Sequence, residues 1–178
     1  APGLDTLGVL LPSTPLHFLL FHALLDAPAG HGWLDASCAR ALVATSANIG
    51  GDPLLCDDDS LAAAFGDLVQ GVLGHDRAIS ARLDDSVIAA HGMTMTMVRR
   101  ARGFAPEAIR LRRDGPVTLA TGAHLKNTAA LLRGDLALLS PHIGDLDSAA
   151  SRSFHESSID RLLQTLGAAP ELLACDWH

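Results

Sequence analysis

Lysine is almost absent from this sequence. Among 178 residues Lys126 is the single lysine, and every other fixed positive charge is an arginine. The formal net charge is -7, so the chain lacks the excess of basic residues that a nonspecific phosphate-backbone binder carries. This composition argues against nonspecific nucleic-acid binding. It leaves room for a nucleotide, because a nucleotide needs only a local pocket.

Cysteine and long apolar runs are also scarce. Cys38, Cys56 and Cys175 form no CxxC pair and are odd in number, which suits a reducing cytoplasm better than a disulfide scaffold. No stretch approaches the roughly eighteen consecutive apolar residues of a membrane helix, and no signal peptide is visible. The nine histidines show no metal-ligand spacing. We therefore expect a cytoplasmic protein with no membrane partner and no metal ligands in this segment.

The overall composition predicts a packed core. Hydrophobic residues make up 48% of the chain, charged residues 19%, and the mean hydropathy is +0.25. The apolar pattern and the turn residues predict an α/β (α+β) fold. In the first hundred residues we expect a strand at 7–11, a helix opened by Thr14 and Pro15, a short helix at 36–40, a strand at 41–45, a helix capped by Ser60, and paired strands at 86–90 and 94–98.

Six arginines between residues 99 and 113 separate this part from the C-terminal residues, and Asp114-Gly115-Pro116 closes the stretch. The composition predicts a boundary between a domain at 1–113 and a domain at 116–178. In the second domain we expect a β-meander of strands 117–121, 127–132 and 136–140 with tight turns at 122–123 and 133–135, a helix begun by Asp147 or Ser148 that buries Ile159, Leu162, Leu163 and Leu166 and ends at Gly167, and a strand at 172–175.

Two segments carry residues suited to phosphate or nucleotide binding. Residues 45–53 read Thr-Ser-Ala-Asn-Ile-Gly-Gly-Asp-Pro after a predicted strand; their hydroxyls and amide can bind phosphate or ribose, and their glycines admit a ligand. An Asx-turn closing a strand explains the same residues. Residues 122–128 place Lys126 in a Gly-led turn, where backbone N–H groups and an ammonium can meet a phosphate. A solvated turn lysine is the alternative.

Two further segments hold titratable side chains near strand ends. Residues 75–86 contain His, Arg and paired Asp residues, which can bind Mg²⁺ or simply cap turns. In the segment Ser140–Asp145, His142 can act as a base and Asp145 can meet a magnesium–nucleotide complex. A lone histidine beside proline is more often structural, so residue chemistry alone leaves both alternatives open.

Read together and in order, these pieces resemble the hydrogenase-maturation carbamoyltransferases of the HypF type. The matching segments are LGVLLPSTPLHFLLF at 7–21, LVATSANIGGDP at 42–53, GHDRAISARLDDSV at 74–87, VRRARGFAP at 98–106, LATGAHLKNTAAL at 119–131, LSPHIGDLDS at 139–148 and ACDWH at 174–178. The resemblance implies that residues 1–113 are the C-terminal half of a YrdC-like twisted-sheet domain. Residues 116–178 are then the opening β-meander, helix and strand of an ASKHA-type domain.

The resemblance also implies a reaction. In the family, carbamoyl phosphate and ATP, used with Mg²⁺, yield carbamoyl-adenylate, and the carbamoyl group passes to the C-terminal cysteine of a partner maturation protein for cyanide-ligand synthesis in [NiFe]-hydrogenase. The full-length proteins of the family also bind zinc, in modules whose ligands are not in this segment. Double-stranded RNA binding is implied only by analogy with the YrdC fold.

Site residues are implied by the same resemblance. Ser46 and Asn48 should contact the adenylate, and Asn127 and Thr128 should bind phosphate beside Lys126. Lys126, His142 and Asp145 are the expected catalytic residues.

Departures from the family pattern are mild at Ser13, Ala47 and Asp52. The first half of the YrdC-like domain, the zinc modules and the downstream histidines lie outside this sequence. We therefore expect the segment to be marginally stable and not to catalyse the full reaction alone.

Two alternatives remain. A threonylcarbamoyl-adenylate synthase of the YrdC type carries a similar Ser-x-Asn element, although residues 122–128 and 141–146 argue against it. A truncated, non-catalytic remnant is the other alternative.

Overall fold

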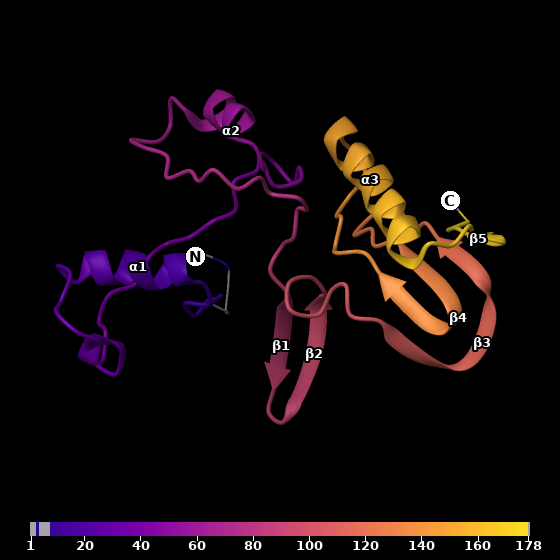
Figure 1. The fold of residues 1–178 in the computed structure, drawn as a ribbon, viewed down its shortest axis with the longest axis horizontal. Coiled ribbons are helices and arrows are strands. Elements are labelled where there is room, and N and C mark those ends of the chain that lie inside the picture. The colour runs from indigo at the N-terminus through magenta and orange to yellow at the C-terminus, as the bar shows by residue number, and fades with distance from the viewer. Residues whose placement is uncertain (1–2, 4–7, 178) are drawn as a thin grey trace. The chain divides into compact units, whose positions relative to one another are not determined.

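The computed structural model describes Gly3 and residues 8–177, and its mixed helices and strands confirm the α/β class (Figure 1). The chain divides into two compact units, Ala1–Ala44 and Thr45–His178, which are considered separately. None of the helices within the described residues is both long and apolar enough to cross a membrane. The elements are α1 (Pro15–Leu24), η1 (Gly32–Leu34), α2 (Asp58–Phe65), β1 (Val87–His91), β2 (Thr94–Arg99), β3 (Ile109–Ala120), β4 (Ala130–Leu139), α3 (Ala149–Leu166) and β5 (Leu172–Ala174).

The first unit contains one helix of the expected kind. Thr14 caps α1 by accepting from the His17 N–H, and Pro15 stands at its first position, where the missing proline N–H costs nothing. Three other predictions for this unit are wrong. Residues 8–11 and 41–45 form no strand, and residues 36–40 form no helix, since the helical turn comes earlier, at η1. An apolar run becomes a strand only beside a hydrogen-bonding neighbour, and within the described residues neither run has one. Leu7 lies outside them.

In α2 the cap is Asp57 rather than Ser60, which corrects the sequence prediction. The Asp57 carboxylate accepts from the Ser60 N–H at 2.8 Å. This hydrogen bond is the main cause that lowers the pKa of Asp57 below its ordinary value. The sequence prediction named only Ser60, but Asp57, three positions earlier, has the side-chain oxygen that reaches a free N–H of the first turn.

Strands β1 and β2 confirm the predicted hairpin around Gly92. They pair antiparallel, with Ala90 opposite Met95 and Ile88 opposite Met97. Gly92 has a φ of 61°, a conformation that glycine adopts without steric cost. The second strand of the hairpin, β2, ends at Arg99, which is the first arginine of the Arg-rich stretch.

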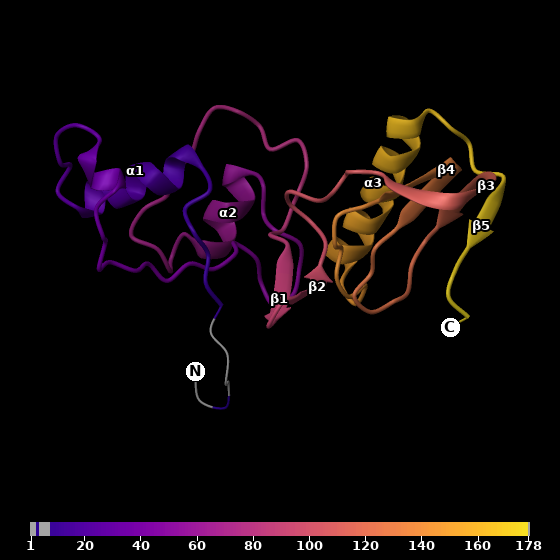
Figure 2. The ribbon, with the colours of Figure 1, turned by 90° about the horizontal axis from the view of Figure 1, so that it is seen from below.

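The C-terminal part is a small sheet covered by one helix. The strand order is β4-β3-β5, with β4 antiparallel and β5 parallel to β3, and α3 packs on β4 (Figure 2). The buried cluster consists of Leu119, Ala129, Leu131, Leu138 and Leu162, with Val117, Ile159, Leu163 and Leu166 packed against it. The predicted inward face of the helix is therefore confirmed, as is the strand before Cys175.

The predicted meander needs a correction in its bounds. The structure assigns residues 130–139 to one strand, β4, where the sequence predicted two. Ten fully extended residues would span about 33 Å. Yet the residues that flank β4 are hydrogen-bonded to each other, with the Ser140 N–H donating to the Ala129 carbonyl at 2.8 Å. The chain therefore reverses within β4, and Gly134, with a φ of 62°, allows that reversal (Figure 1).

Helix α3 begins and ends where the sequence predicted. Ser148 is its N-cap, and a capping box joins Ser148 to Ser151. Gly167 ends the helix in the left-handed conformation, with a φ of 54°. The N-cap at Ser148 fixes where the 141–147 loop ends, because that loop leads directly into it.

The predicted boundary at residues 113–116 falls inside a continuous strand. β3 runs from Ile109 to Ala120, and Gly115 pairs with Gly134 across the ladder. The division into compact units lies between residues 44 and 45. The division into domains at 1–113 and 116–178 stays a prediction.

The C-terminal core gives a test of stability. Leu131 is fully buried, so Leu131→Ala should lower the free energy of unfolding by about 2–5 kcal/mol through lost burial and a cavity. Leu125 is 60% exposed, and Leu125→Ala should change it by less than about 0.5 kcal/mol. Urea denaturation followed by circular dichroism measures both. Equal effects for the two variants would contradict the packing described.

Candidate active site in the C-terminal unit

A cavity of about 350 Å³ lies within residues 45–178 and brings together two of the predicted segments. One wall comes from the loop with Ser46 and Asn48, and another from the loop with His142 and Asp145. The full lining is Ser46, Asn48, Gly50–Leu54, Arg82–Asp84, Arg99, His142–Asp145, Asp147, Ser148 and Phe154. Four of the seven predicted site residues therefore share one cavity, although they are about a hundred residues apart in sequence.

The Ser46–Pro53 loop is organised by its own side chains. The Ser46 hydroxyl donates to the Asn48 side-chain oxygen, and the Asn48 Nδ2 donates to the Asp52 carbonyl at 2.9 Å. Gly50 and Gly51 have φ values of 51° and 90°. The Asx-type interpretation and the binding interpretation are thus both compatible with the geometry. The turn orients Ser46 and Asn48 on the cavity wall, where the hydroxyl oxygen can still accept and the amide can still donate one proton.

The other three predicted residues, Lys126, Asn127 and Thr128, lie on the 121–128 hairpin and do not line this cavity. Asn127 is 1% exposed, and its Nδ2 donates to the carbonyls of Thr121 at 3.0 Å and Ala123 at 2.6 Å. Its Oδ1 is buried without a partner. In this structure the Asn127 amide therefore folds the turn, and only its oxygen retains unused hydrogen-bonding capacity.

Gly122 is required for that turn. It has a φ of 76°, and a Cβ there would stand 2.6 Å from the Thr128 carbonyl oxygen and 2.8 Å from the Asn127 Nδ2. Both distances are below any normal contact, so the hairpin admits no side chain at residue 122. The sequence signal of a Gly-led turn is explained by this close approach.

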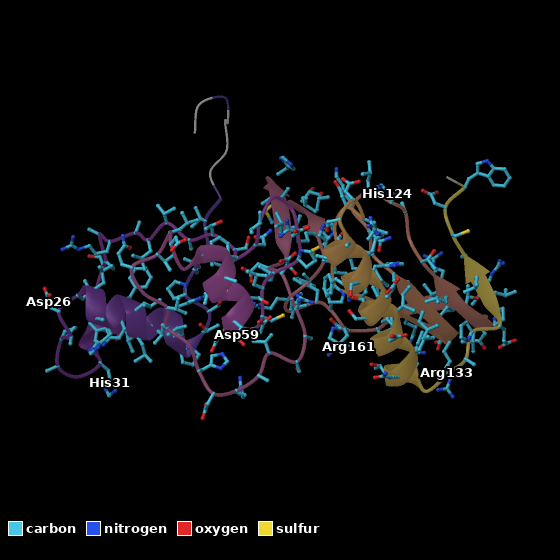
Figure 3. All side chains as sticks on the ribbon, turned by 90° about the horizontal axis from the view of Figure 1, so that it is seen from above. Asp26, His31, Asp59, His124, Arg133 and Arg161 are labelled. Atoms are coloured by element: carbon cyan, nitrogen blue, oxygen red, sulfur yellow. The ribbon has the colours of Figure 1, made fainter. Side chains whose placement is uncertain are left out.

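A short ladder ties the hairpin to the loop that carries His142 and Asp145. The Asn127 N–H donates to the Gly144 carbonyl at 2.9 Å, and the Ile143 N–H donates to the Asn127 carbonyl at 2.9 Å. The Lys126 N–H donates to the Asp145 Oδ1 at 2.7 Å. Two residues before Lys126, the Nε2 of His124 lies 2.8 Å from the Oδ1 of Asp147 (His124 is labelled in Figure 3). The hairpin residues are thus held at the edge of the cavity although they do not line it.

His142 is half-buried in the cavity wall, and its surroundings favour the neutral imidazole. Burial lowers the pKa of His142 below its ordinary value, and the positive charges of Arg99 and Lys126 lower this pKa further. Asp84 and Asp145 oppose the shift. A neutral imidazole near pH 7 can accept a proton or a hydrogen bond, as a general base requires.

Arg82 and Arg99 also line the cavity, although neither was predicted as a site residue. The Arg82 Nε donates to the Leu54 carbonyl at 2.6 Å, and its guanidinium lies 5.7 Å from the centre of the Phe154 ring. Remaining guanidinium N–H groups of Arg82 are available to an anion. The signal was present, because Arg82 precedes the Asp84–Asp85 pair that the sequence analysis noted and Arg99 opens the Arg-rich stretch.

The carboxylates of the cavity suit a metal that arrives with its ligand. Within the part of the chain that the structure describes, no three His, Cys, Asp or Glu side chains come together as a metal site. Asp52, Asp84, Asp145 and Asp147 nevertheless line the cavity. Mg²⁺ is commonly held by one or two carboxylates plus substrate phosphates, and this donor set fits that arrangement.

Comparison with known protein families divides the chain in two. Residues 113–178 match the family described as the HypF Kae1-like domain. Residues 1–101 match the family described as telomere recombination, which is the YrdC-like family. The matched regions place Ser46, Asn48, Arg82 and Arg99 in the first part of the chain, which is YrdC-like, and Lys126, His142 and Asp145 in the Kae1-like part.

Curated relatives cover the whole chain. Carbamoyltransferase HypF2 of Cupriavidus necator is 45% identical over 100% of this chain, carbamoyltransferase HypF of Rhizobium leguminosarum bv. viciae is 44% identical over 100%, and a probable carbamoyltransferase HypF of Methanocaldococcus jannaschii is 30% identical over 99%. The chain spans 22%, 22% and 21% of the lengths of these relatives.

Solved structures agree with the sequence relatives. Full-length HypF in its phosphate- and nucleotide-bound form superposes with a TM-score of 0.83 at 32% identity, covering 100% of this chain and 26% of that one. HypF of T. kodakarensis gives a TM-score of 0.70 at 30% identity, covering 75% of this chain and 18% of that one. The chain therefore belongs to the HypF carbamoyltransferase family, of which it contains YrdC-like and Kae1-like sequence.

Proposed function

We propose that this chain supplies part of the active site of an ATP-dependent carbamoyltransferase. Carbamoyl phosphate, ATP and one water molecule give carbamoyl-adenylate, phosphate and diphosphate, and the carbamoyl group then passes to the C-terminal cysteine of a partner maturation protein. The product thiocarbamate would serve cyanide-ligand synthesis in [NiFe]-hydrogenase. Two findings support the proposal: the relatives are named carbamoyltransferases, and one related structure holds phosphate and nucleotide.

The shared cavity is the observation that carries the proposal. Residues from the YrdC-like match, Ser46 and Asn48, and residues from the Kae1-like match, His142 and Asp145, line the same space. A volume of about 350 Å³ falls in the range of small-ligand sites. A reaction that forms an adenylate and then transfers its acyl group needs both sets of residues near one reactive intermediate.

Each residue has a role that its surroundings suit. Ser46 and Asn48 hydrogen-bond the adenylate, and Arg82 and Arg99 balance the charge that develops on the departing phosphate side. Mg²⁺ bound to the nucleotide would screen phosphate charge. As the partner's sulfur bonds to the carbamoyl carbon, the carbon–oxygen bond to AMP breaks.

His142, neutral near pH 7, accepts the proton that leaves the thiol. Lys126 offers its ammonium to the phosphate from the hairpin.

The two alternatives are less well supported. A free-standing threonylcarbamoyl-adenylate synthase would require only the YrdC-like sequence, whereas residues 113–178 match the HypF Kae1-like domain. A non-catalytic remnant would have no need of a cavity lined from both segments.

Lys126 tests the division of labour between the two segments. In a protein that carries this segment at the length of the relatives, Lys126→Ala should reduce carbamoyl transfer by about 10-fold or more. Carbamoyl-phosphate-dependent ATP–pyrophosphate exchange should change much less. Radiolabelled pyrophosphate exchange and mass spectrometry of the partner's cysteine measure the two steps. Arg112→Ala, which removes an exposed cation from β3, is the control, and equal loss of both steps in Lys126→Ala would refute the assignment.

Ser46 and Asn48 test adenylate binding in the same protein. Ser46→Ala combined with Asn48→Ala should lower the exchange rate by about 10-fold or more, because two hydrogen bonds to the intermediate are lost. Ser153→Ala, an exposed serine on α3, serves as the matched control. If the double variant exchanges pyrophosphate as fast as the parent, the 46–53 loop is a turn and nothing more.

The pH behaviour of His142 depends on its neighbours. Its imidazole should titrate with a pKa below 6.5. Arg99→Ala should raise this pKa, because a repelling positive charge is removed, and Asp84→Asn should lower it. NMR titration of the histidine ring protons measures the His142 pKa in the parent protein and in both variants. Since the folded-state pKa is lowered, the neutral form contributes stability above about pH 6.5 that is lost as the pH falls. A His142 midpoint above 6.5 would contradict the described environment.

A further inference from the structure

Lys126 has an unusual backbone conformation. Its φ is 51°, and among the described residues only Asp26 and Ala27 share a positive φ without being glycine. A lysine in the left-handed region is unfavourable, because its Cβ crowds the backbone and its side chain offers no local hydrogen bond in return. The surrounding structure must therefore hold Lys126 in place. That need directs attention to the partner of its N–H group.

The Lys126 N–H donates to a side chain, whereas the hydrogen bonds on either side of it join backbone groups only. Asn127 donates its N–H to the Gly144 carbonyl, and the Leu146 N–H donates to the His124 carbonyl at 3.0 Å. Between these two bonds, the Lys126 N–H meets the Asp145 Oδ1 at 2.7 Å. A short bond to a charged acceptor is stronger than one to a carbonyl. Asp145 thus completes the ladder at a residue that is not glycine yet has a left-handed backbone.

Two cavity carboxylates contact the hairpin, but in different ways: Asp147 pairs with the His124 side chain, whereas Asp145 accepts from the backbone N–H of Lys126. One of its oxygens is committed to the hairpin, yet Asp145 lines the cavity that Lys126 does not line. Both residues are close enough to His142 to influence its charge, with opposite signs. Asp145 therefore stands where the hairpin meets the cavity. Removing the Asp145 carboxylate would therefore break the hydrogen bond to the Lys126 N–H.

We propose that Asp145 is a positioning residue, whose carboxylate holds the Lys126 backbone in its left-handed conformation and so fixes where the Lys126 ammonium stands. From its residue type and position, Asp145 is predicted to meet a magnesium–nucleotide complex. The hydrogen bond assigns it instead to the lysine hairpin. The activity arm of the test rests on the proposed function, and the structural arm does not.

The structural arm uses amide hydrogen exchange by NMR on this chain. The Lys126 amide should exchange about fivefold or more slowly than the amide of its exposed neighbour Leu125. Asp145→Asn keeps an acceptor oxygen and should retain that protection within about twofold, whereas Asp145→Ala should remove it. The buried Leu131 amide reports in each variant that the sheet is still folded. Full protection of Lys126 in Asp145→Ala would overturn the proposal.

The activity arm is a double-mutant cycle in the protein of full family length. If Asp145 acts through Lys126, transfer by Asp145→Ala combined with Lys126→Ala should match transfer by Lys126→Ala alone, within about twofold. Asp145→Asn should retain at least about tenfold more transfer activity than Asp145→Ala. A double variant markedly slower than Lys126→Ala, or an asparagine variant as slow as the alanine variant, would show that Asp145 acts directly on the ligand or its metal, and would overturn the proposal.

The two arms fail in different ways. If Lys126→Ala leaves transfer unchanged, the proposed function of the hairpin is lost, while the exchange of the Lys126 amide still decides whether Asp145 holds it. If transfer depends on Lys126 but the amide is unprotected in the parent, the proposed function stands and the positioning role is refuted.

Discussion

The hydrogen-bonded contact between the 121–128 hairpin and the 142–146 loop is the constraint on which the site depends. Each segment alone is a surface turn, but together they form a ladder through Asn127 and Gly144. The ladder extends the sheet core, because the Ala129 carbonyl next to it accepts from Ser140. Burial of Leu131 and Leu138 on β4 thereby places the hairpin. The packed core of the sheet thus helps to determine where the hairpin holds Lys126.

Local signals predicted the C-terminal part well. Ser148, Gly167 and the inward leucines of α3 are short-range features, and a helix with a capping residue, an apolar stripe and a terminal glycine needs no distant information. The 8–11 and 41–45 runs show the limit of the same reasoning. Their apolar residues satisfy a strand pattern, but a strand depends on its neighbour, which the sequence of the run does not contain.

The site was predictable in part, for the same reason. Ser46, Asn48, His142 and Asp145 were predicted as site residues from the family resemblance, since residue chemistry alone left their roles open, and the structure brings them to one cavity. That Arg82 and Arg99 join them depends on tertiary proximity, which no spacing rule conveys. Asp145 was predicted as a site residue, but its hydrogen bond to the Lys126 N–H was not. The two residues are nineteen positions apart, and the left-handed backbone of Lys126 is not evident from the sequence.

Gly122 shows how little freedom the hairpin leaves to sequence drift. Any change at this residue adds at least a Cβ, and that atom would collide with the backbone of Thr128 and the amide of Asn127. These atoms belong to the hairpin, which lies between strands β3 and β4. A substitution here would therefore displace the hairpin that carries Lys126, so selection on the position of this lysine should act on the glycine together with selection on folding.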